Sequence, residues 1–249
     1  MKLVADIGAT NTRVKVGDFY TEFKTKDFFE KFKEIEKSHS FDKIVFGLAR
    51  TIKSDSITIN KNVTIKKSDF KKYDPIFIND VQAQAYGLKK LKKSEFIKLN
   101  DAKGFGETKA IVTVGTGLGA SYYNEAAFPS ALSSLFKDKN IYQDYLSGKG
   151  LTKIYYEFYN KKVKPEVAIK DKKTRIKFFS LLGEVCYIYS MCVLPFAGLY
   201  LSGGILNKNV DLFEKEAFFS KFNKRTHYKD IPVFLVKPQD LGVRGCEVL

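Results

Sequence analysis

The feature that most constrains the fold is a short motif that occurs twice: a strand pattern, a turn of small residues and a returning strand pattern. The first copy spans residues 3–16 and has residues 8–11 at its tip. The second copy spans residues 110–123 and has residues 115–119 at its tip. Alternation of apolar and polar residues beside a short turn is typical of a β-hairpin. Two such hairpins, about one domain length apart, predict an internal duplication of the fold.

The rest of the chain alternates strand and helix patterns, which predicts an α/β protein in two lobes. Lys, Asn, Asp and Gly accumulate at residues 95–108. We therefore expect an N-terminal lobe at 1–105 and a C-terminal lobe at 106–249. The expected strands lie near 20–25, 43–48, 63–66, 75–78, 199–202 and 231–236, and the expected helices near 26–37, 81–91, 139–160 and 173–194.

The composition limits the classes of partner. The chain has 43 Lys+Arg against 28 Asp+Glu, a formal net charge of +15 that attracts anions. The basic residues are spread along the chain and no nucleic-acid-binding motif is visible, so we expect no nucleic-acid partner. Residues 185–206 carry no charge. Proline and glycine interrupt this stretch, so we interpret it as a buried helix and strand and expect no membrane partner.

Two further features point to the cytoplasm. The apolar run after Met1-Lys2 is broken at Asp6, which makes it too short for a signal peptide. The chain has three cysteines and two histidines, too few for a disulfide framework, so a reducing compartment is the simple interpretation.

Four segments carry candidate chemistry, and each has an ordinary structural alternative. The turn at 8–11 offers backbone N–H groups to a phosphate, with Asp6 beside it, but alone it is also an ordinary hairpin tip. The glycine turn at 115–119 is followed by a strand pattern, which disfavours a dinucleotide site of the Rossmann type. Asn79-Asp80 ends an apolar strand, where a carboxylate can act as a base or merely cap a helix. Gly203-Gly204 follows another strand and allows a flat group to approach the backbone, or is a plain turn.

The order and spacing of these segments resemble those of the bacterial-type glucokinases, a family of the actin-like, hexokinase and Hsp70 superfamily. The resemblance covers essentially the whole chain and includes a Leu-Ser-Gly-x-Gly-Leu segment at 146–151. It implies a two-lobed actin-like ATPase fold, related to ribonuclease H, with duplicated mixed-sheet domains. The segments that carry it read Asp6-Ile-Gly8-Ala-Thr10-Asn11, Ile78-Asn79-Asp80, Gly115-Thr116-Gly117-Leu-Gly and Ser202-Gly203-Gly204-Ile.

The resemblance implies an ATP-dependent carbohydrate kinase that uses Mg²⁺. Asp80 would be the base that takes the proton of the acceptor hydroxyl, and Asn79 would hold a neighbouring hydroxyl. Asp6 would bind Mg²⁺ through water. The implied nucleotide-binding residues are Gly8, Thr10, Asn11, Thr12, Gly115, Thr116 and Gly117 for the phosphates, and Gly203 and Gly204 for the adenosine.

The sugar-binding segment departs from the family pattern. In the family a Pro-Gly-Glu-Gly-Gly-His segment follows the second hairpin, but here Ala131 stands at the Glu position and Ser134 at the His position. Gln143 replaces a further Glu, and Arg50 stands where the family has small residues. The helix expected after the last strand is cut back to residues 245–249.

Loss of these groups with retention of Asn79-Asp80 predicts an altered acceptor, bound in part by Ser134 and Arg50. We expect a small sugar or a sugar acid, with 2-keto-3-deoxygluconate as the leading acidic candidate. A kinase for neutral hexoses and a non-catalytic nucleotide or metabolite sensor remain open alternatives, as does a homodimer.

Overall fold

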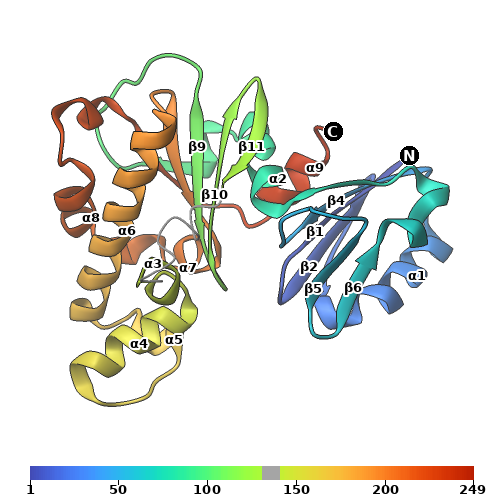
Figure 1. Ribbon diagram of the computed structural model, residues 1–249, viewed down its shortest axis with the longest axis horizontal. Helices are drawn as coiled ribbons and strands as arrows, with labels where there is room; N and C mark the ends of the chain where they lie inside the picture. The colour runs from blue at the N-terminus through green and yellow to red at the C-terminus, as the bar shows by residue number, and fades with distance from the viewer. Residues whose placement is uncertain (131–140) are drawn as a thin grey trace. The chain divides into compact units, whose positions relative to one another are not determined.

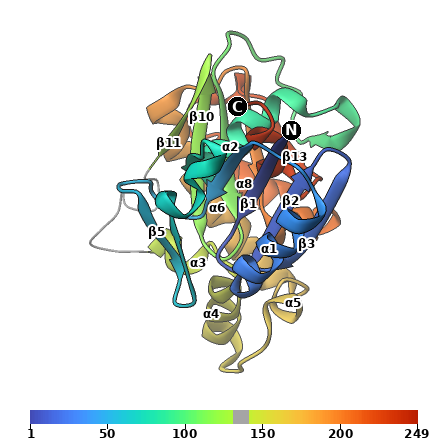
Figure 2. The ribbon, with the colours of Figure 1, turned by 90° about the vertical axis from the view of Figure 1, so that its right-hand side faces the viewer.

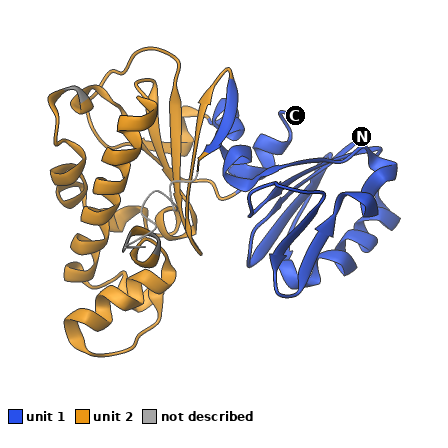
Figure 3. Cartoon of the chain, viewed as in Figure 1, with its two compact units in different colours: residues 1–91, 126–129, 240–249 blue, residues 92–125, 130–239 orange. Residues whose placement is uncertain are grey.

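The computed structural model describes residues 1–130 and 141–249, which form two compact units (Figure 3). Unit 1 comprises residues 1–91, 126–129 and 240–249, and unit 2 comprises residues 92–125 and 130–239. The division differs from the expected lobes at 1–105 and 106–249 in three ways. Residues 92–105 belong to unit 2, because a strand at 96–98 pairs with the last strand of that unit's sheet. Residues 126–129 and the C-terminal residues 240–249 belong to unit 1.

Unit 1 is built on a five-stranded sheet with the order β3-β2-β1-β4-β7 (Figure 1). The expected hairpin is present, with β1 antiparallel to β2, and β4 and β7 extend the sheet in parallel. The register places Asp6 opposite Arg13 on β2 and opposite Gly47 on β4. The strands are β1 (Lys2–Ile7), β2 (Asn11–Val16), β3 (Phe19–Lys24), β4 (Lys43–Leu48) and β7 (Ile76–Asn79).

The two faces of β1 are covered by different helices. Leu3, Ala5 and Ile7 pack in a core with α1 (Phe28–Ser38), in which Phe28 and Phe32 contact Phe46 edge to face. Val4 points to the other face and packs against α2 (Asp80–Gly87) and α9 (Leu241–Cys246). Because side chains alternate along a strand, Asp6 shares the face of Val4 and lies under α9.

A two-stranded hairpin completes unit 1. It consists of β5 (Ser56–Asn60) and β6 (Val63–Lys66), and a 3₁₀ helix at Lys67–Tyr73 follows it (Figure 2). Ile57 and Ile65 bury one face of the hairpin in the core that contains α1. The strand at 63–66 was expected, but β5 was not. Its sequence, Ser56-Ile-Thr-Ile-Asn60, alternates polar and apolar residues, so the local pattern does contain a strand signal that the prediction missed.

Unit 2 repeats the same arrangement. β9 (Lys109–Val114) and β10 (Leu118–Asn124) form the second hairpin, and β12 (Gly198–Ser202) and β13 (Val233–Val236) extend it in parallel. β8 (Phe96–Lys98) pairs antiparallel with β13 at the edge. A hairpin followed by two parallel strands therefore occurs in both units, which confirms the predicted duplication. β11 (Ala126–Ser130) follows β10, and its first four residues belong to unit 1.

The longest helix described in unit 2 is α6 (Lys172–Val193). The other helices are α3 (Ile141–Tyr145), α4 (Gly148–Tyr159), α5 (Pro165–Ala168), α7 (Gly204–Asn207) and α8 (Lys215–Phe222). α6 contacts α3, α4 and α8, and a Cβ at Gly183 would lie only 2.1 Å from the carbonyl oxygen of Phe218. By length and composition α6 is apolar enough to cross a membrane, but half of its most apolar window is buried in the protein. A buried core helix passes the same test.

Two expected helices differ from the structure. In its described part, from residue 141, the helix expected at 139–160 is broken between α3 and α4, because Ser147 caps α4 by accepting from the Gly150 amide. The helix after the last strand is not restricted to residues 245–249, since α9 spans Leu241–Cys246. A Cβ at Gly245 would lie 1.6 Å from the carbonyl oxygen of Ala83, so this glycine allows α9 to approach α2 closely.

Candidate functional site

The turn between β1 and β2 has its carbonyl oxygens turned into unit 1. The Thr25 hydroxyl donates to the Gly8 carbonyl (2.7 Å) and the Thr25 amide donates to the Thr10 carbonyl (3.0 Å). The Asn60 side-chain amide donates to the Ala9 carbonyl at 3.0 Å. The Gly8 amide donates to the Asn11 carbonyl at 3.1 Å. All four carbonyl groups of residues 8–11 are thereby engaged.

The amide groups of the same turn are left available. Across the two described stretches, 1–130 and 141–249, no hydrogen bond satisfies the amides of Ala9 and Thr10. Thr10 is exposed, and the turn has no carboxylate among its own four residues. Backbone N–H groups whose carbonyls face away form a concave site for an anion. The geometry of the turn therefore fits a phosphate group.

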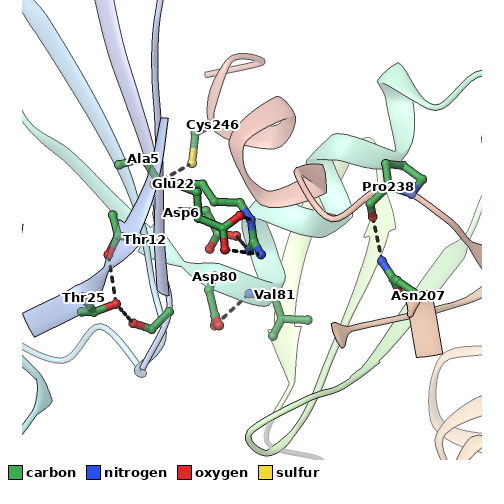
Figure 4. Close-up of polar contacts among 12 residues, drawn as sticks. Ala5, Asp6, Thr12, Glu22, Thr25, Asp80, Val81, Asn207, Pro238 and Cys246 are labelled. Carbon is green, nitrogen blue, oxygen red and sulfur yellow. Dashed lines mark hydrogen bonds and ion pairs between the residues drawn. The ribbon is translucent and has the colours of Figure 1, made fainter. Parts of the chain in front are cut away.

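Thr12 has a role that differs from the expected phosphate contact. Its hydroxyl is fully buried and lies 3.0 Å from the Thr25 hydroxyl (Figure 4). A hydroxyl has one proton, and that of Thr25 is used on Gly8, so Thr12 must donate to Thr25. The Thr12 hydroxyl therefore has no proton left for a phosphate. Asn11 also has an internal contact, because its side-chain oxygen accepts from the Lys24 ammonium group at 2.9 Å.

Asp6 is a buried carboxylate, only 8% exposed, on β1 beside this turn. Its Oδ2 atom lies 3.8 Å from Nη1 of Arg13, which is also bonded through Nε to Glu22 at 3.2 Å. Burial raises the pKa of Asp6 to about 6, and the positive charge of Arg13 opposes that shift. Gly242 of α9 is in close contact with it, since a Cβ there would lie 2.7 Å from Oδ2.

Asn79 and Asp80 lie where β7 ends and α2 begins. The Asn79 side-chain oxygen caps α2 by accepting from the amides of Val81 (3.1 Å) and Gln82 (3.2 Å). Its side-chain amide donates to Oδ1 of Asp80 at 3.1 Å. The capping role that we weighed as the alternative is thus present for Asn79. It also fixes the carboxylate of Asp80 next to it.

Asp80 has the ionisation expected of a base that works near neutral pH. Burial and the neighbouring negative charge of Asp6 raise the pKa of Asp80 to about 7. The Val81 amide, which donates to Oδ1 at 2.9 Å, and the Asn79 amide stabilise the ionised form and oppose the shift. A carboxylate that is half ionised near pH 7 can accept a proton and release it again.

Arg50 is joined to the same part of unit 1. Its carbonyl oxygen accepts from the Asn79 side-chain amide at 3.1 Å. Its guanidinium group is exposed, and Nε donates to the Thr58 carbonyl of β5 at 3.1 Å. Among the described residues the other two guanidinium nitrogens have no partner, so they can bind an anionic group.

The corresponding turn of unit 2 is held by backbone groups. The Gly115 amide donates to the Gly117 carbonyl at 3.0 Å, and the Gly148 amide donates to the Gly115 carbonyl at 3.1 Å. Gly148 belongs to the Leu-Ser-Gly-x-Gly-Leu segment, so that segment supports the turn directly. Thr116 and Gly117 are exposed, and in the described part of the chain their amides have no partner. This turn also fits an anion.

Gly203 and Gly204 lie between β12 and α7 in unit 2. Gly203 has φ +107°, and a Cβ there would lie 2.3 Å from the carbonyl oxygen of Val114 at the end of β9. Only glycine fits such a position. Gly204 is open, because no described atom lies within 4 Å of the place that a Cβ would take. Asn207 ties α7 to the end of unit 2 by donating to the Pro238 carbonyl at 2.7 Å (Figure 4).

The residues of unit 1 fit Mg²⁺ only in the way that nucleotide-dependent enzymes use it. Within residues 1–130 and 141–249, no group of three or more His, Cys, Asp or Glu side chains could hold a metal ion. Mg²⁺ prefers oxygen ligands and is commonly held by one or two carboxylates together with water and substrate phosphates. Asp6 offers one such carboxylate, beside a turn that fits a phosphate.

Several features of the site were not predicted. Four residues contact the predicted site residues from distant positions in the sequence: Thr25, Asn60, Gly148 and Gly242. Only Gly148 lies in a segment that carries a sequence motif. Ser134 and Ala131 lie outside the described residues, and the Gln143 side chain is not described either.

Comparisons with known proteins identify the family of the chain. A family model described as Glucokinase matches residues 3–134 and 124–249. The glucokinase of Campylobacter jejuni subsp. doylei is 26% identical over 217 residues, which covers 70% of this chain and 65% of the relative. The chain thus spans slightly less than two thirds of that relative's length.

Two solved structures show the fold. A glucokinase from an Antarctic psychrotroph has a TM-score of 0.79 at 18% identity and covers 99% of this chain and 97% of its own. A ROK family glucokinase from Streptomyces griseus, in complex with glucose and AMPPNP, has a TM-score of 0.69 at 14% identity, with coverage of 98% and 97%. These likenesses confirm the predicted two-lobed actin-like fold class.

Proposed function

Because the chain belongs to the glucokinase family, we propose that it is an ATP-dependent kinase that phosphorylates a hydroxyl of a small sugar or sugar acid. One observation carries the proposal most. A half-buried carboxylate, Asp80, lies at the start of α2, with a pKa raised to about 7 by burial and by Asp6. Asp80 also accepts from the Val81 amide at the start of α2, but that amide already has Asn79 as an acceptor, so capping does not require this second carboxylate. Asn79 already caps this helix.

In the proposed reaction the oxygen of the acceptor hydroxyl attacks the γ-phosphorus of ATP. The bond between that phosphorus and the β,γ-bridging oxygen breaks, and ADP leaves. The hydroxyl proton passes to the carboxylate of Asp80. Phosphoryl transfer needs positioning and neutralisation of charge more than covalent chemistry, so the remaining groups act on the phosphates and the acceptor.

Each remaining group has a proposed task. The amides of Ala9 and Thr10 in unit 1, and those of Thr116 and Gly117 in unit 2, bind phosphate oxygens. Asp6 holds Mg²⁺ through water, and the ion, when bound, neutralises phosphate charge. Gly203 and Gly204 contact the adenosine. Asn79 orients Asp80. Both protons of its side-chain amide are used, on the Arg50 carbonyl and on Asp80, so it can hold a neighbouring hydroxyl of the acceptor only by exchanging one of these bonds. The three free cysteines agree with a reducing, cytoplasmic setting.

The acceptor is proposed to be a sugar acid, with 2-keto-3-deoxygluconate as the leading candidate. Two observations support a negatively charged acceptor. The sequence lacks the two Glu residues and the His that the family places around the sugar ring, and Arg50 is attached to Asn79 through its carbonyl group. A missing hydrogen bond to a substrate hydroxyl costs about 1–3 kcal/mol, so three missing groups weaken selection for glucose. The competing proposal is a neutral hexose, which the names of the relatives favour.

The test is release of ADP from Mg-ATP by the purified protein across a panel of acceptors. The panel contains glucose, mannose, N-acetylhexosamines, glycerate, gluconate and 2-keto-3-deoxygluconate, and Asp80→Asn is the control. Turnover with one acceptor that is lost in the control supports the kinase and identifies its substrate. Equal or better turnover of glucose would rule out the acid proposal. If no acceptor gives ADP release while ATP still binds, the result would favour a nucleotide sensor.

A further inference from the structure

We propose that Thr25 and Asn60 are positioning residues that orient the phosphate-binding turn of unit 1 by binding its carbonyl oxygens. This inference rests on the proposed function, because the turn is taken to bind the phosphates of ATP. Neither residue belongs to the motif around the turn. Thr25 follows β3, and Asn60 ends β5.

Thr25 holds two of the four carbonyl groups. It is fully buried, its hydroxyl donates to Gly8 and its amide donates to Thr10. The hydroxyl cannot turn away, because the Thr12 hydroxyl donates into its oxygen at 3.0 Å from the other side (Figure 4). A buried chain of two hydroxyl groups therefore ends on the first carbonyl of the turn. Such a chain has one consistent direction for its protons.

Asn60 holds the third carbonyl group from the tip of the β5–β6 hairpin. Its side-chain oxygen accepts from the amides of Asn62 (2.9 Å) and Val63 (3.0 Å). These two donors identify which end of the side-chain amide is oxygen, so the nitrogen end must face the Ala9 carbonyl. The hairpin thereby fixes the direction of this bond.

The direction of these carbonyl groups decides whether the turn attracts or repels a phosphate. A peptide carbonyl that faced outward would bring a partial negative charge toward the phosphate oxygens. When all four face inward, the amides of Ala9 and Thr10 face the anion with no carbonyl beside them, and no reorganisation is needed on binding. Loss of one inner donor leaves a carbonyl without its partner, and that carbonyl gains by turning outward to water.

Four variants test this arrangement. Thr25→Val removes the hydroxyl at almost constant shape, whereas Thr25→Ser keeps it. Asn60→Asp keeps the oxygen that binds Asn62 and Val63 but replaces the donor to Ala9 with an acceptor. Thr64→Val is the control for loss of a threonine hydroxyl in unit 1, because it breaks the exposed pair Thr58 and Thr64, whose hydroxyls are also 3.0 Å apart but do not bond to the turn.

Affinity for AMPPNP is measured by calorimetry with Mg²⁺ present, and KM is measured for ATP and for the acceptor. We expect Thr25→Val and Asn60→Asp each to weaken AMPPNP binding about tenfold and to raise KM for ATP. KM for the acceptor should stay within about twofold of wild type. A general loss of structure in unit 1 would instead raise KM for both substrates. Thr25→Ser should stay within about threefold of wild type in AMPPNP affinity and Thr64→Val within about twofold.

The outcomes separate this inference from the proposed function. If wild type binds AMPPNP and both folded variants bind it equally well, the positioning role is overturned and the kinase proposal stands. If wild type binds no nucleotide, both proposals fail. Thermal melting and circular dichroism verify folding, and if Thr25→Val does not fold, Asn60→Asp still decides the matter, since it leaves the Thr12–Thr25 pair intact. If Thr64→Val loses as much affinity for AMPPNP as Thr25→Val does, the positioning role of Thr25 would also be overturned.

Discussion

The two glycine-containing turns occupy equivalent places in the duplicated fold, yet they are held in different ways. The turn of unit 1 is held from inside by side chains, Thr25 and Asn60, and Gly8 is tightly packed. The turn of unit 2 is held by the backbone of Gly148. A Cβ at Gly117 would have open space around it, and one at Gly115 would make only an ordinary contact. A hydrogen bond from a side chain can be removed by a single substitution, whereas a hydrogen bond from a backbone amide cannot be removed by changing a side chain. The turn of unit 1 should therefore be the more sensitive of the two to side-chain changes.

The two hairpins also differ in charge. Asp6 lies one residue before the last residue of β1, and the register of the two hairpins places Thr113 at the equivalent point of β9. Unit 1 thus carries both carboxylates of the candidate site, and unit 2 has a neutral residue at the place that matches Asp6. Under the proposed function both turns bind phosphate, but acid–base chemistry belongs to unit 1 alone.

The largest effect is expected beneath the turn of unit 2, at Gly203. Gly203→Ala places a Cβ 2.3 Å from the Val114 carbonyl oxygen at φ +107°, so it should lower the free energy of unfolding by about 3 kcal/mol or more. Gly117→Ala is the matched control, because no described atom lies within 4 Å of its Cβ, and it should change stability by less than about 0.5 kcal/mol. Urea unfolding measures both. Equal stability of the two variants would contradict the packing described for Gly203.

A smaller effect is expected when the turns themselves are compared. In Gly8→Ala the new Cβ lies 2.9 Å from the Asn11 carbonyl oxygen, which must shift, so we expect a loss of about 1–2 kcal/mol. In Gly115→Ala the nearest atom is the Gly204 amide nitrogen at 3.8 Å, an ordinary contact, and stability should stay within about 0.5 kcal/mol of wild type. Thermal melts of both variants test this. A larger loss in Gly115→Ala would reverse the contrast between the tightly packed and the open turn.

A further effect depends on pH and concerns the charge difference between the units. The folded-state pKa of Asp80, about 7, lies above its ordinary value of 3.8, so the folded state binds more protons between these pH values and the stability contributed by Asp80 falls as pH rises. Asp80→Asn removes that loss. It should be more stable than wild type at pH 8, by at most the roughly 4 kcal/mol that corresponds to a rise in pKa from 3.8 to about 7, and equally stable near pH 3. Unfolding measured at both pH values checks this, and a variant less stable than wild type at pH 8 would show that Asp80 is stabilised as a carboxylate.

Local patterns in the sequence were sufficient for the hairpins, for the strand that ends at Asn79 and for most of the helices. They were insufficient wherever a contact joins distant residues. Two glycines in the last helix argue against a helix by propensity, but Gly242 and Gly245 are there because Asp6 and Ala83 leave no room for a side chain. Thr12 matched a phosphate motif, yet its partner Thr25, thirteen residues away, turns its hydroxyl inward. The predicted sugar-acid acceptor remains a prediction.

The most direct test of the central claim is the pH dependence of kcat/KM for the best acceptor, measured from pH 5 to 9 for wild type and for Asp80→Asn. If Asp80 is the base, kcat/KM of wild type should rise tenfold per pH unit on the acid side and level off at or below pH 7, because Mg²⁺ held by Asp6 would offset the negative charge that helps to raise the pKa of Asp80. Asp80→Asn should be slower by about 10²–10⁴-fold and should lose this rising limb while it still binds AMPPNP. A variant that keeps the wild-type rate and pH profile would contradict the assignment of Asp80 as the base.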